Sequence, residues 1–328
     1  MRRREFITLL GGAAATWPLA AHAQQAERVR RIGVLVPGAA GNSEFQDRVA
    51  AFREGLRKLG WSEGRNARID ERWSADAAEL GTHAAELARM TPDVILACAA
   101  SALRPMQRAT RTIPIVFANV PDPVANGFVT NLARPGGNIT GFANYEPAIA
   151  VKWLELLKQI APQVARVAFI YDPANPTGTA YLHEIQAAAS SFGVLIFGTA
   201  VRNGEEIEHA IAAFAREANG GLIVAGGPST TSYLPALTAL AGRHRLPVVY
   251  PNREAVAAGI LASYGVDPND LFQRAASYVD RIFKGEKPGD LPIQFATKFV
   301  LVINLKTAKA LGLSIPQSLL LRADKVIK

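Results

Sequence analysis

The fold is decided by residues 93–117, which read DVILACAASALRPMQRATRTIPIVF. Two short apolar runs, 93–97 and 112–117, are bounded by turn residues and separated by a segment of helix length, which is typical of neighbouring buried parallel strands. Such strands end on the same edge of one sheet, and open α/β sheets bind ligands at that carboxyl edge. There the small loop Ala99-Ala100-Ser101 leaves helix N-terminal amides free for a carboxylate or polar group. We therefore expect a ligand site at this edge.

Length and composition bound the class of protein. A chain of 328 residues with 49% hydrophobic and 20% charged residues is typical of a folded globular protein with about two domains. The formal charge is +8, but the 36 basic residues are spread along the chain rather than clustered. This spread favours an ordinary solvated surface over a nucleic-acid surface, so we expect no nucleic-acid partner.

The first 23 residues resemble an export signal. Arg2-Arg3-Arg4 precede an apolar run from Phe6 to Ala20, and Ala21-His22-Ala23 is a small-residue cleavage pattern. The stretch Arg3-Arg4-Glu5-Phe6-Ile7 is similar to a twin-arginine signal, with the general secretory route and a retained membrane anchor as alternatives. We expect export to the periplasm and a mature chain that begins at Gln24.

The pattern of strands and helices indicates two similar units. A series of alternating strands and helices runs from Ile32 to Gly141, begins again with a helix through Val151 and Ile160, and ends near Gly265. The later elements would overfill the second unit, so we expect the chain to cross between lobes near Thr140, Gly265 and Ala296. The expected divisions are an export signal at 1–23, lobe 1 at 29–140 plus about 266–295, and lobe 2 at 141–265 plus about 296–328.

Several motifs carry a family resemblance. They are IPIVF at 113–117, DPV at 122–124, LARPGGNITG at 132–141 and FVLVINLKTAKALGL at 299–313. With these motifs the chain resembles the ABC-transporter substrate-binding family that includes tryptophan- and tyrosine-binding members, over essentially the whole mature sequence. The resemblance implies an α/β, type I periplasmic-binding fold, with two Rossmann-like lobes of parallel sheet joined by a three-crossover hinge. It also implies capture of a small molecule between the lobes and delivery to an ABC permease in the inner membrane.

The alternative is an exported α/β enzyme acting on a small carboxylate or ester. Ser101, Ser229 and Thr230 could be nucleophiles, but the sequence contains no GxSxG elbow. The histidines at 83, 183, 209 and 244 fall on expected helices or their ends, no two are at i, i+4 spacing, and Cys98 is the single cysteine. We therefore expect a monomeric binding protein with no catalytic residue, metal, cofactor or intrachain disulfide.

Polar and small residues in the expected edge loops are the candidate ligand-binding residues. For lobe 1 they are Ser43, Ala100, Ser101, Asn119 and Asp122, and for lobe 2 they are Asn175, Ser229, Thr230 and Tyr264. Ser43 is also a candidate helix cap, Asp122 a loop-rigidifying residue, Asn175 a turn residue before a proline, and Tyr264 a core residue.

The expected ligand is a small amphiphilic anion or zwitterion, such as an aromatic or branched amino acid. Loop amides and hydroxyls suit a carboxylate, and tyrosine rings suit an apolar body. The candidates for an aromatic wall are Tyr145, Tyr171, Tyr250 and Tyr264, whereas Tyr233 is expected inside a helix.

Overall fold

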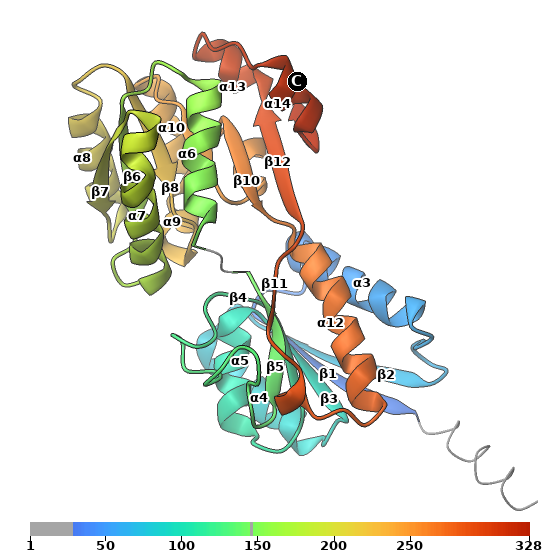
Figure 1. Ribbon diagram of the computed structural model, residues 1–328. Helices are drawn as coiled ribbons and strands as arrows, with labels where there is room; N and C mark the ends of the chain where they lie inside the picture. Colours follow the sequence, from blue (N-terminus) through green and yellow to red (C-terminus); the bar gives the residue numbers. More distant parts are fainter. Residues whose placement is uncertain (1–28, 145–146) are drawn as a thin grey trace, which may run out of the picture. The chain divides into compact units, whose positions relative to one another are not determined.

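The computed structural model describes residues 29–144 and 147–328, which fold into two compact units (Figure 1). Of the described residues, unit 1 contains those up to Ala143 together with Leu271–Gln294, and unit 2 contains Asn144–Asp270 together with Phe295–Lys328. The chain therefore passes from one unit to the other after Ala143, after Asp270 and after Gln294.

Unit 1 is built around a six-stranded sheet with the strand order β11-β5-β4-β3-β1-β2. Its elements are β1 (Arg30–Val36), α3 (Ser43–Lys58), β2 (Ala67–Trp73), α4 (Ala77–Arg89), β3 (Val94–Cys98), α5 (Ala99–Ala109), β4 (Ile115–Val120), β5 (Ile139–Ala143), α12 (Pro268–Phe283), the 3-10 turn Pro288–Asp290 and β11 (Gln294–Phe295). The strands β2, β1, β3, β4 and β5 are parallel to their neighbours, so their carboxyl ends share one edge.

Helices cover both faces of this sheet. On one face, α4 and α5 share a core with β3 and β4 through residues such as Leu87, Leu103 and Phe117. On the other face, α3 and α12 pack so closely that a Cβ on Gly55 would lie 2.5 Å from the backbone oxygen of Gln273. Because every strand residue of β3 is buried, the run VILAC is uniformly apolar rather than alternating.

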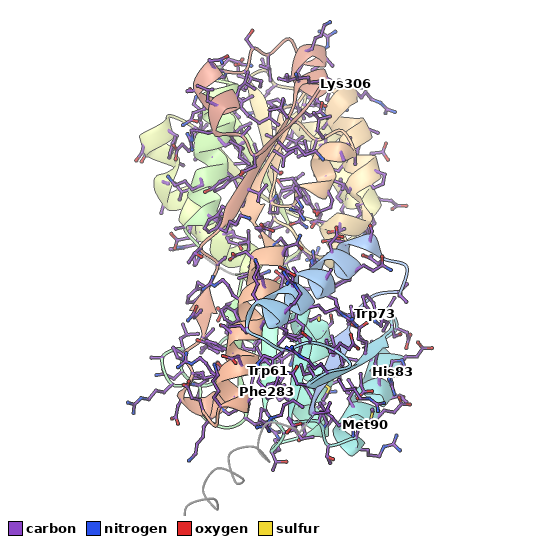
Figure 2. The ribbon with its side chains drawn as sticks, turned by 90° about the vertical axis from the view of Figure 1, so that its right-hand side faces the viewer. Trp61, Trp73, His83, Met90, Phe283 and Lys306 are labelled. Carbon is purple, nitrogen blue, oxygen red and sulfur yellow. The ribbon has the colours of Figure 1, made fainter. Side chains whose placement is uncertain are left out.

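The segment that returns to unit 1 is fixed by aromatic and polar contacts. Trp61 and Phe283 lie side by side in Figure 2, with ring centroids 4.8 Å apart. The indole Nε1 of Trp61 donates to the carboxylate of Asp280 at 3.0 Å, and Lys284 pairs with the same carboxylate at 2.8 Å. From Leu271 onward the helix α12 thereby belongs to unit 1, although it follows most of unit 2 in the sequence.

Unit 2 contains a seven-stranded sheet with the order β13-β12-β10-β9-β8-β6-β7. Its elements are α6 (Ile149–Ile160), β6 (Arg166–Tyr171), α7 (Pro176–Ala188), the 3-10 turn Ala189–Phe192, β7 (Leu195–Ala200), α8 (Gly204–Phe214), β8 (Gly220–Val224), α9 (Pro228–Ser232), α10 (Leu234–Arg243), β9 (Val248–Tyr250), α11 (Glu254–Ala257), β10 (Ala262–Val266), β12 (Phe299–Asn304), α13 (Leu305–Ala310), α14 (Gln317–Arg322) and β13 (Lys325–Ile327).

Two cores lie on opposite faces of this second sheet. Trp153 of α6 and Ile185 of α7 belong to the first core, and Ile211 of α8 and Leu237 of α10 belong to the second. The predicted fold class, two α/β units built on parallel sheets, is confirmed. Two strands depart from it, because β12 runs antiparallel to β10 and β13 runs parallel to β12.

Among the described residues, no helix combines the length and apolar character needed to cross a bilayer. The expected signal at 1–23 lies outside the described residues.

Candidate functional site

The carboxyl edge of the unit 1 sheet contains unusual backbone conformations. Ala99 (φ 69°) follows β3, Asn119 (φ 63°) lies within β4, and Asp122 (φ 29°) follows β4. The register between β4 and β5 shifts between Ala118 and Val120, so Asn119 is the bulged residue. Residues held in such sparsely populated conformations cost about 1–3 kcal/mol each and cluster at ligand sites.

The remaining non-glycine residues of positive φ in the described chain have an ordinary explanation. Thr91, Asn219 and Arg245 lie in turns that lead into β3, β8 and β9, at the amino ends of those strands. Among the described non-glycine residues, positive φ at the carboxyl end of a strand therefore occurs in unit 1, at the edge where sequence reasoning expected a ligand.

The first turn of α5 lies at this edge. Its N-cap residue is Cys98, which makes no side-chain cap hydrogen bond, whereas α3 and α4 are capped by Asn42 and Asp76. Ala100 is half-buried, and Ser101 is the third residue of the helix with an exposed side chain. The amides of this turn have no side-chain cap and can meet a carboxylate.

Ser43 does not cap α3, which corrects one of the two roles considered for it. Asn42 is the cap, and its side-chain oxygen accepts from the amide of Phe45 at 3.1 Å. Ser43 is the first helical residue and is exposed. Either residue type can cap a helix, so the point at which the helix begins decides between them.

The Asp122 side chain has a partner within its own loop. Its Oδ1 accepts from the amide of Ala125 at 3.0 Å, and its backbone oxygen accepts from the Asn126 side chain at 3.0 Å. This arrangement rigidifies the loop after β4, one of the two roles that the sequence suggested.

Arg48 is a charged residue of this edge that sequence reasoning missed. It lies on the buried stripe of α3 one turn before Phe52, its side chain is 9% exposed, and its Nε has no hydrogen-bond partner among the described residues. The guanidinium pairs with Glu44 and stacks 4.7 Å from the Phe45 ring. A cation at i, i+4 spacing within an apolar stripe is the signal that could have identified it.

Cys98 lies beside this cation but is inert. Burial raises the pKa of the Cys98 thiol, and the charge of Arg48 lowers it by less. A thiol that stays protonated is neither a nucleophile nor a metal ligand. In the described chain, no group of three or more His, Cys, Asp and Glu side chains is placed to hold a metal.

In unit 2, Asn175 and Thr230 lie by the loop that follows β8. Asn175 caps α7, its Oδ1 accepting from the amide of Thr177 at 3.1 Å, and its Nδ2 would be 3.2 Å from a Cβ on Gly227. Thr230 is 1% exposed, and its hydroxyl donates to the backbone oxygen of Ala225 at 2.8 Å. Thr230 therefore fixes the loop from within. Ser229 lies in α9, and its side chain is outside the described part of the chain.

The candidate tyrosines are in different surroundings. Tyr250 is 1% exposed and belongs to the core, whereas Tyr171 and Tyr264 are half-buried. The Tyr264 ring stacks on Phe299 at 5.7 Å. Tyr145 lies outside the described residues. Tyr233 is not inside a helix, because α9 ends at Ser232 and α10 begins at Leu234.

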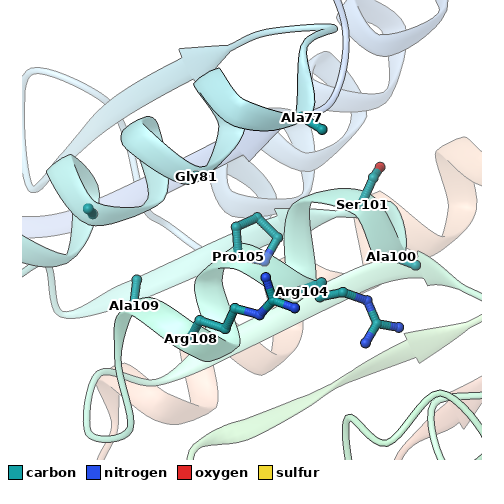
Figure 3. Close-up of a pocket in the computed structure, with 9 residues that line it drawn as sticks. Ala77, Gly81, Ala100, Ser101, Arg104, Pro105, Arg108 and Ala109 are labelled. Carbon is teal, nitrogen blue, oxygen red and sulfur yellow. The ribbon is translucent and has the colours of Figure 1, made fainter.

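A groove lies between α4 and α5 in unit 1, with a volume of about 580 Å³ (Figure 3). Small residues line it on both helices, and Arg104 and Arg108 of α5 lie along it. The residues that line it are Ala77, Gly81, Ala85, Ala100, Ser101, Arg104, Pro105, Arg108 and Ala109. Two candidate residues that are consecutive in the sequence, Ala100 and Ser101, lie at one of its ends.

The chain matches the family described as ABC transporter substrate binding protein over residues 34–327. A relative, the tyrosine-binding protein of Clostridioides difficile (strain R20291), is 25% identical over 264 residues, covering 80% of this chain and 75% of the relative.

Two solved structures are similar over almost their whole length. The ABC domain in complex with L-Trp from Streptococcus pneumoniae has a TM-score of 0.78 and 26% identity, covering 91% of this chain and 99% of that chain. A conserved domain protein from Vibrio cholerae O1 biovar El Tor str. N16961 has the same TM-score, 0.78, and 26% identity, covering 91% of this chain and 100% of that chain.

Proposed function

Because this chain belongs to the ABC transporter substrate binding protein family, we propose that it captures an aromatic amino acid and delivers it to a permease in the inner membrane. Capture between two lobes, export to the periplasm and action as a monomer are parts of this proposal. They rest on the family and on the leader sequence, not on the geometry of either unit. The alternative of an exported enzyme has no specific observation in its favour.

The observation that carries the proposal is the carboxyl edge of the unit 1 sheet. Ala99, Asn119 and Asp122 adopt costly backbone conformations there, beside an uncapped helix N-terminus. We assign the amides of the first turn of α5, with Arg48 behind them, to the ligand carboxylate. The Asn119 side chain is assigned to a polar group of the ligand.

The relatives support the choice of ligand class. One is named a tyrosine-binding protein, and another was solved with L-Trp bound. Both ligands combine a zwitterionic end with an aromatic body, as the amides and half-buried tyrosines of this chain would require.

A ligand panel tests the class. L-Tyrosine and L-tryptophan at a hundredfold excess over Kd stabilise a binding protein by about 2.7 kcal/mol, which raises Tm by about 5–10 °C. Tyramine lacks the carboxylate and should raise Tm by less than half as much. A panel in which sugars alone raise Tm, or in which tyramine equals tyrosine, would contradict the proposal.

A matched pair of variants tests the site. Asn119 and Asn219 both adopt the left-handed conformation, at φ 63° and 60°, but they lie at opposite ends of strands. Glycine keeps this conformation without strain, so Asn119→Gly removes the side chain alone. We expect about tenfold weaker amino-acid binding in Asn119→Gly and unchanged binding in Asn219→Gly. Equal affinities would show that Asn119 makes no ligand contact.

A further inference from the structure

The groove between α4 and α5 is lined by small residues that recur at helical spacing on both helices. Ala77, Gly81 and Ala85 recur every fourth residue on α4, and Ser101, Pro105 and Ala109 do so on the facing α5. Residues four apart lie on one face of a helix, so two rows of small side chains face each other. The rows extend over roughly 12 Å, the rise of eight helical residues.

Pro105 interrupts the hydrogen-bond ladder of α5 beside the groove. Proline has no backbone N–H, so the carbonyl of Ser101 cannot receive the usual helical hydrogen bond from residue 105. Ser101 is exposed at the end of the groove, and no hydrogen bond among the described residues uses its hydroxyl. An apolar surface with a few fixed polar points is suited to recognition.

The charge along the groove is positive. Arg104 and Arg108 are exposed, one turn apart on α5, and neither forms a salt bridge among the described residues. The Arg104 guanidinium lies 4.9 Å from the ring centroid of Phe128, which holds it in place.

The nearby acidic residues do not neutralise these arginines. Asp76 caps α4 by accepting from the amides of Ala78 and Glu79 at 2.8 and 2.9 Å. Glu86 pairs with Arg72 of β2 at 3.0 Å, and Glu79 accepts from the Ser74 hydroxyl at 2.6 Å. None of these three carboxylates pairs with Arg104 or Arg108 among the described residues.

The exposure of the groove indicates what kind of partner fits. Six of its lining residues, Ala77, Gly81, Ala85, Ser101, Arg104 and Arg108, are exposed. Small-molecule sites bury about 70–90% of their ligand, which an open trough does not achieve. An amphipathic helix laid along the trough buries only one face, as in helix-in-groove recognition. The basic leader of this chain, with Arg2-Arg3-Arg4, would be repelled by Arg104 and Arg108.

We propose that the groove between α4 and α5 docks an acidic amphipathic helix presented by the membrane partner of this protein. The helix would place small apolar side chains on the two rows and a pair of acidic residues, one turn apart, against Arg104 and Arg108. The identity of the partner as a membrane component rests on the proposed function, whereas the chemistry of the groove does not.

Synthetic peptides test the chemistry directly. The probe is a labelled helical peptide of about 14 residues, or four turns, with alanine and leucine on one face and a pair of glutamates one turn apart at its flank. A second peptide carries lysines in place of the glutamates. By fluorescence anisotropy with the full chain, we expect the glutamate peptide to bind at least about tenfold more tightly.

Two variants of the groove have matched controls in unit 2. The double substitution Arg104→Glu and Arg108→Glu should abolish the preference for the glutamate peptide. Its control replaces two exposed arginines of unit 2, Arg216→Glu and Arg243→Glu, and should leave the preference intact. Gly81→Leu should fill the groove and weaken binding about tenfold. Gly242→Leu is its control, since both glycines are helical and a Cβ on either meets no atom within 4 Å.

Several results would overturn the proposal: equal binding of both peptides, binding that survives the double arginine variant, or no saturable binding at about 1 mM protein. Calorimetric titration of the same variants with L-tyrosine and L-tryptophan distinguishes failure of the docking proposal from failure of the proposed function. If the groove variants lose peptide binding but keep normal amino-acid binding, the result supports the docking surface. If neither the unsubstituted chain nor any variant binds an amino acid, the result counts against the proposed function alone.

Discussion

Alanine should have opposite effects on stability at two helical glycines, because only one of them, Gly55, lies where α3 packs against α12. A Cβ on Gly55 would lie 2.5 Å from the backbone oxygen of Gln273 and 2.8 Å from the Cβ of Ala276. Ordinary contacts between heavy atoms are about 3.5–4.0 Å. Gly81 has the same helical setting, but a Cβ there meets nothing within 4 Å.

The magnitudes follow from two opposing effects. Alanine in place of glycine in a helix stabilises by about 1 kcal/mol. At Gly55 this gain is opposed by overpacking, which costs about 3 kcal/mol at the upper end because the atoms met belong to a helix backbone and its Cβ. We expect Gly55→Ala to lower the free energy of unfolding by about 2 kcal/mol and Gly81→Ala to raise it by about 1 kcal/mol.

Urea unfolding, followed by circular dichroism and by the fluorescence of the tryptophans, measures both changes. Trp61 contacts Phe283 and Asp280 and so reports on α12. Hydrogen exchange of the α12 amides should accelerate in Gly55→Ala and stay unchanged in Gly81→Ala. A Gly55→Ala protein as stable as the unsubstituted chain would refute the close approach of these two helices.

Three further outcomes are expected. Asp280→Ala leaves the Trp61 indole N–H without its acceptor and should cost about 1–3 kcal/mol in urea unfolding; an unchanged midpoint would argue against this hydrogen bond. Burial raises the pKa of the Cys98 thiol, so above pH of about 8.5 the unfolded chain loses a proton that the folded chain keeps. The free energy of unfolding should then fall by up to about 1.4 kcal/mol per pH unit, and Cys98→Ala should remove that slope. Ser101→Ala should weaken amino-acid binding by about 0.5–1.5 kcal/mol with an unchanged Tm; unchanged affinity would remove Ser101 from the site.

The strands and the division into two units follow closely from apolar patterning. The run that begins at Val94 is uniformly apolar because β3 is covered on both faces, and its position between two helices predicted a parallel sheet. Apolar runs predict strands but not their place in the sheet. Leu195 and Phe197 belong to a similar run, yet β7 is an edge strand and these side chains are 64% and 42% exposed.

The candidate site was less predictable because its details depend on backbone conformation. The sequence placed Asn119 on the loop after its strand, but Asn119 is the bulged residue within β4, and this bulge depends on the register with β5. Thr230 was expected to offer a hydroxyl to a ligand, and the turn into α9 instead directs that hydroxyl to the Ala225 carbonyl. Arg48 was missed because hydrophobic periodicity passes over a charged residue on a buried stripe.

Calorimetric titration of the chain with L-tyrosine and L-tryptophan, with mass spectrometry of the recovered ligand, tests most directly whether this protein binds an aromatic amino acid without converting it. We expect saturable one-site binding of at least one of the two amino acids, recovered chemically unchanged. No heat of binding from either amino acid, or recovery of a converted product, would contradict this expectation.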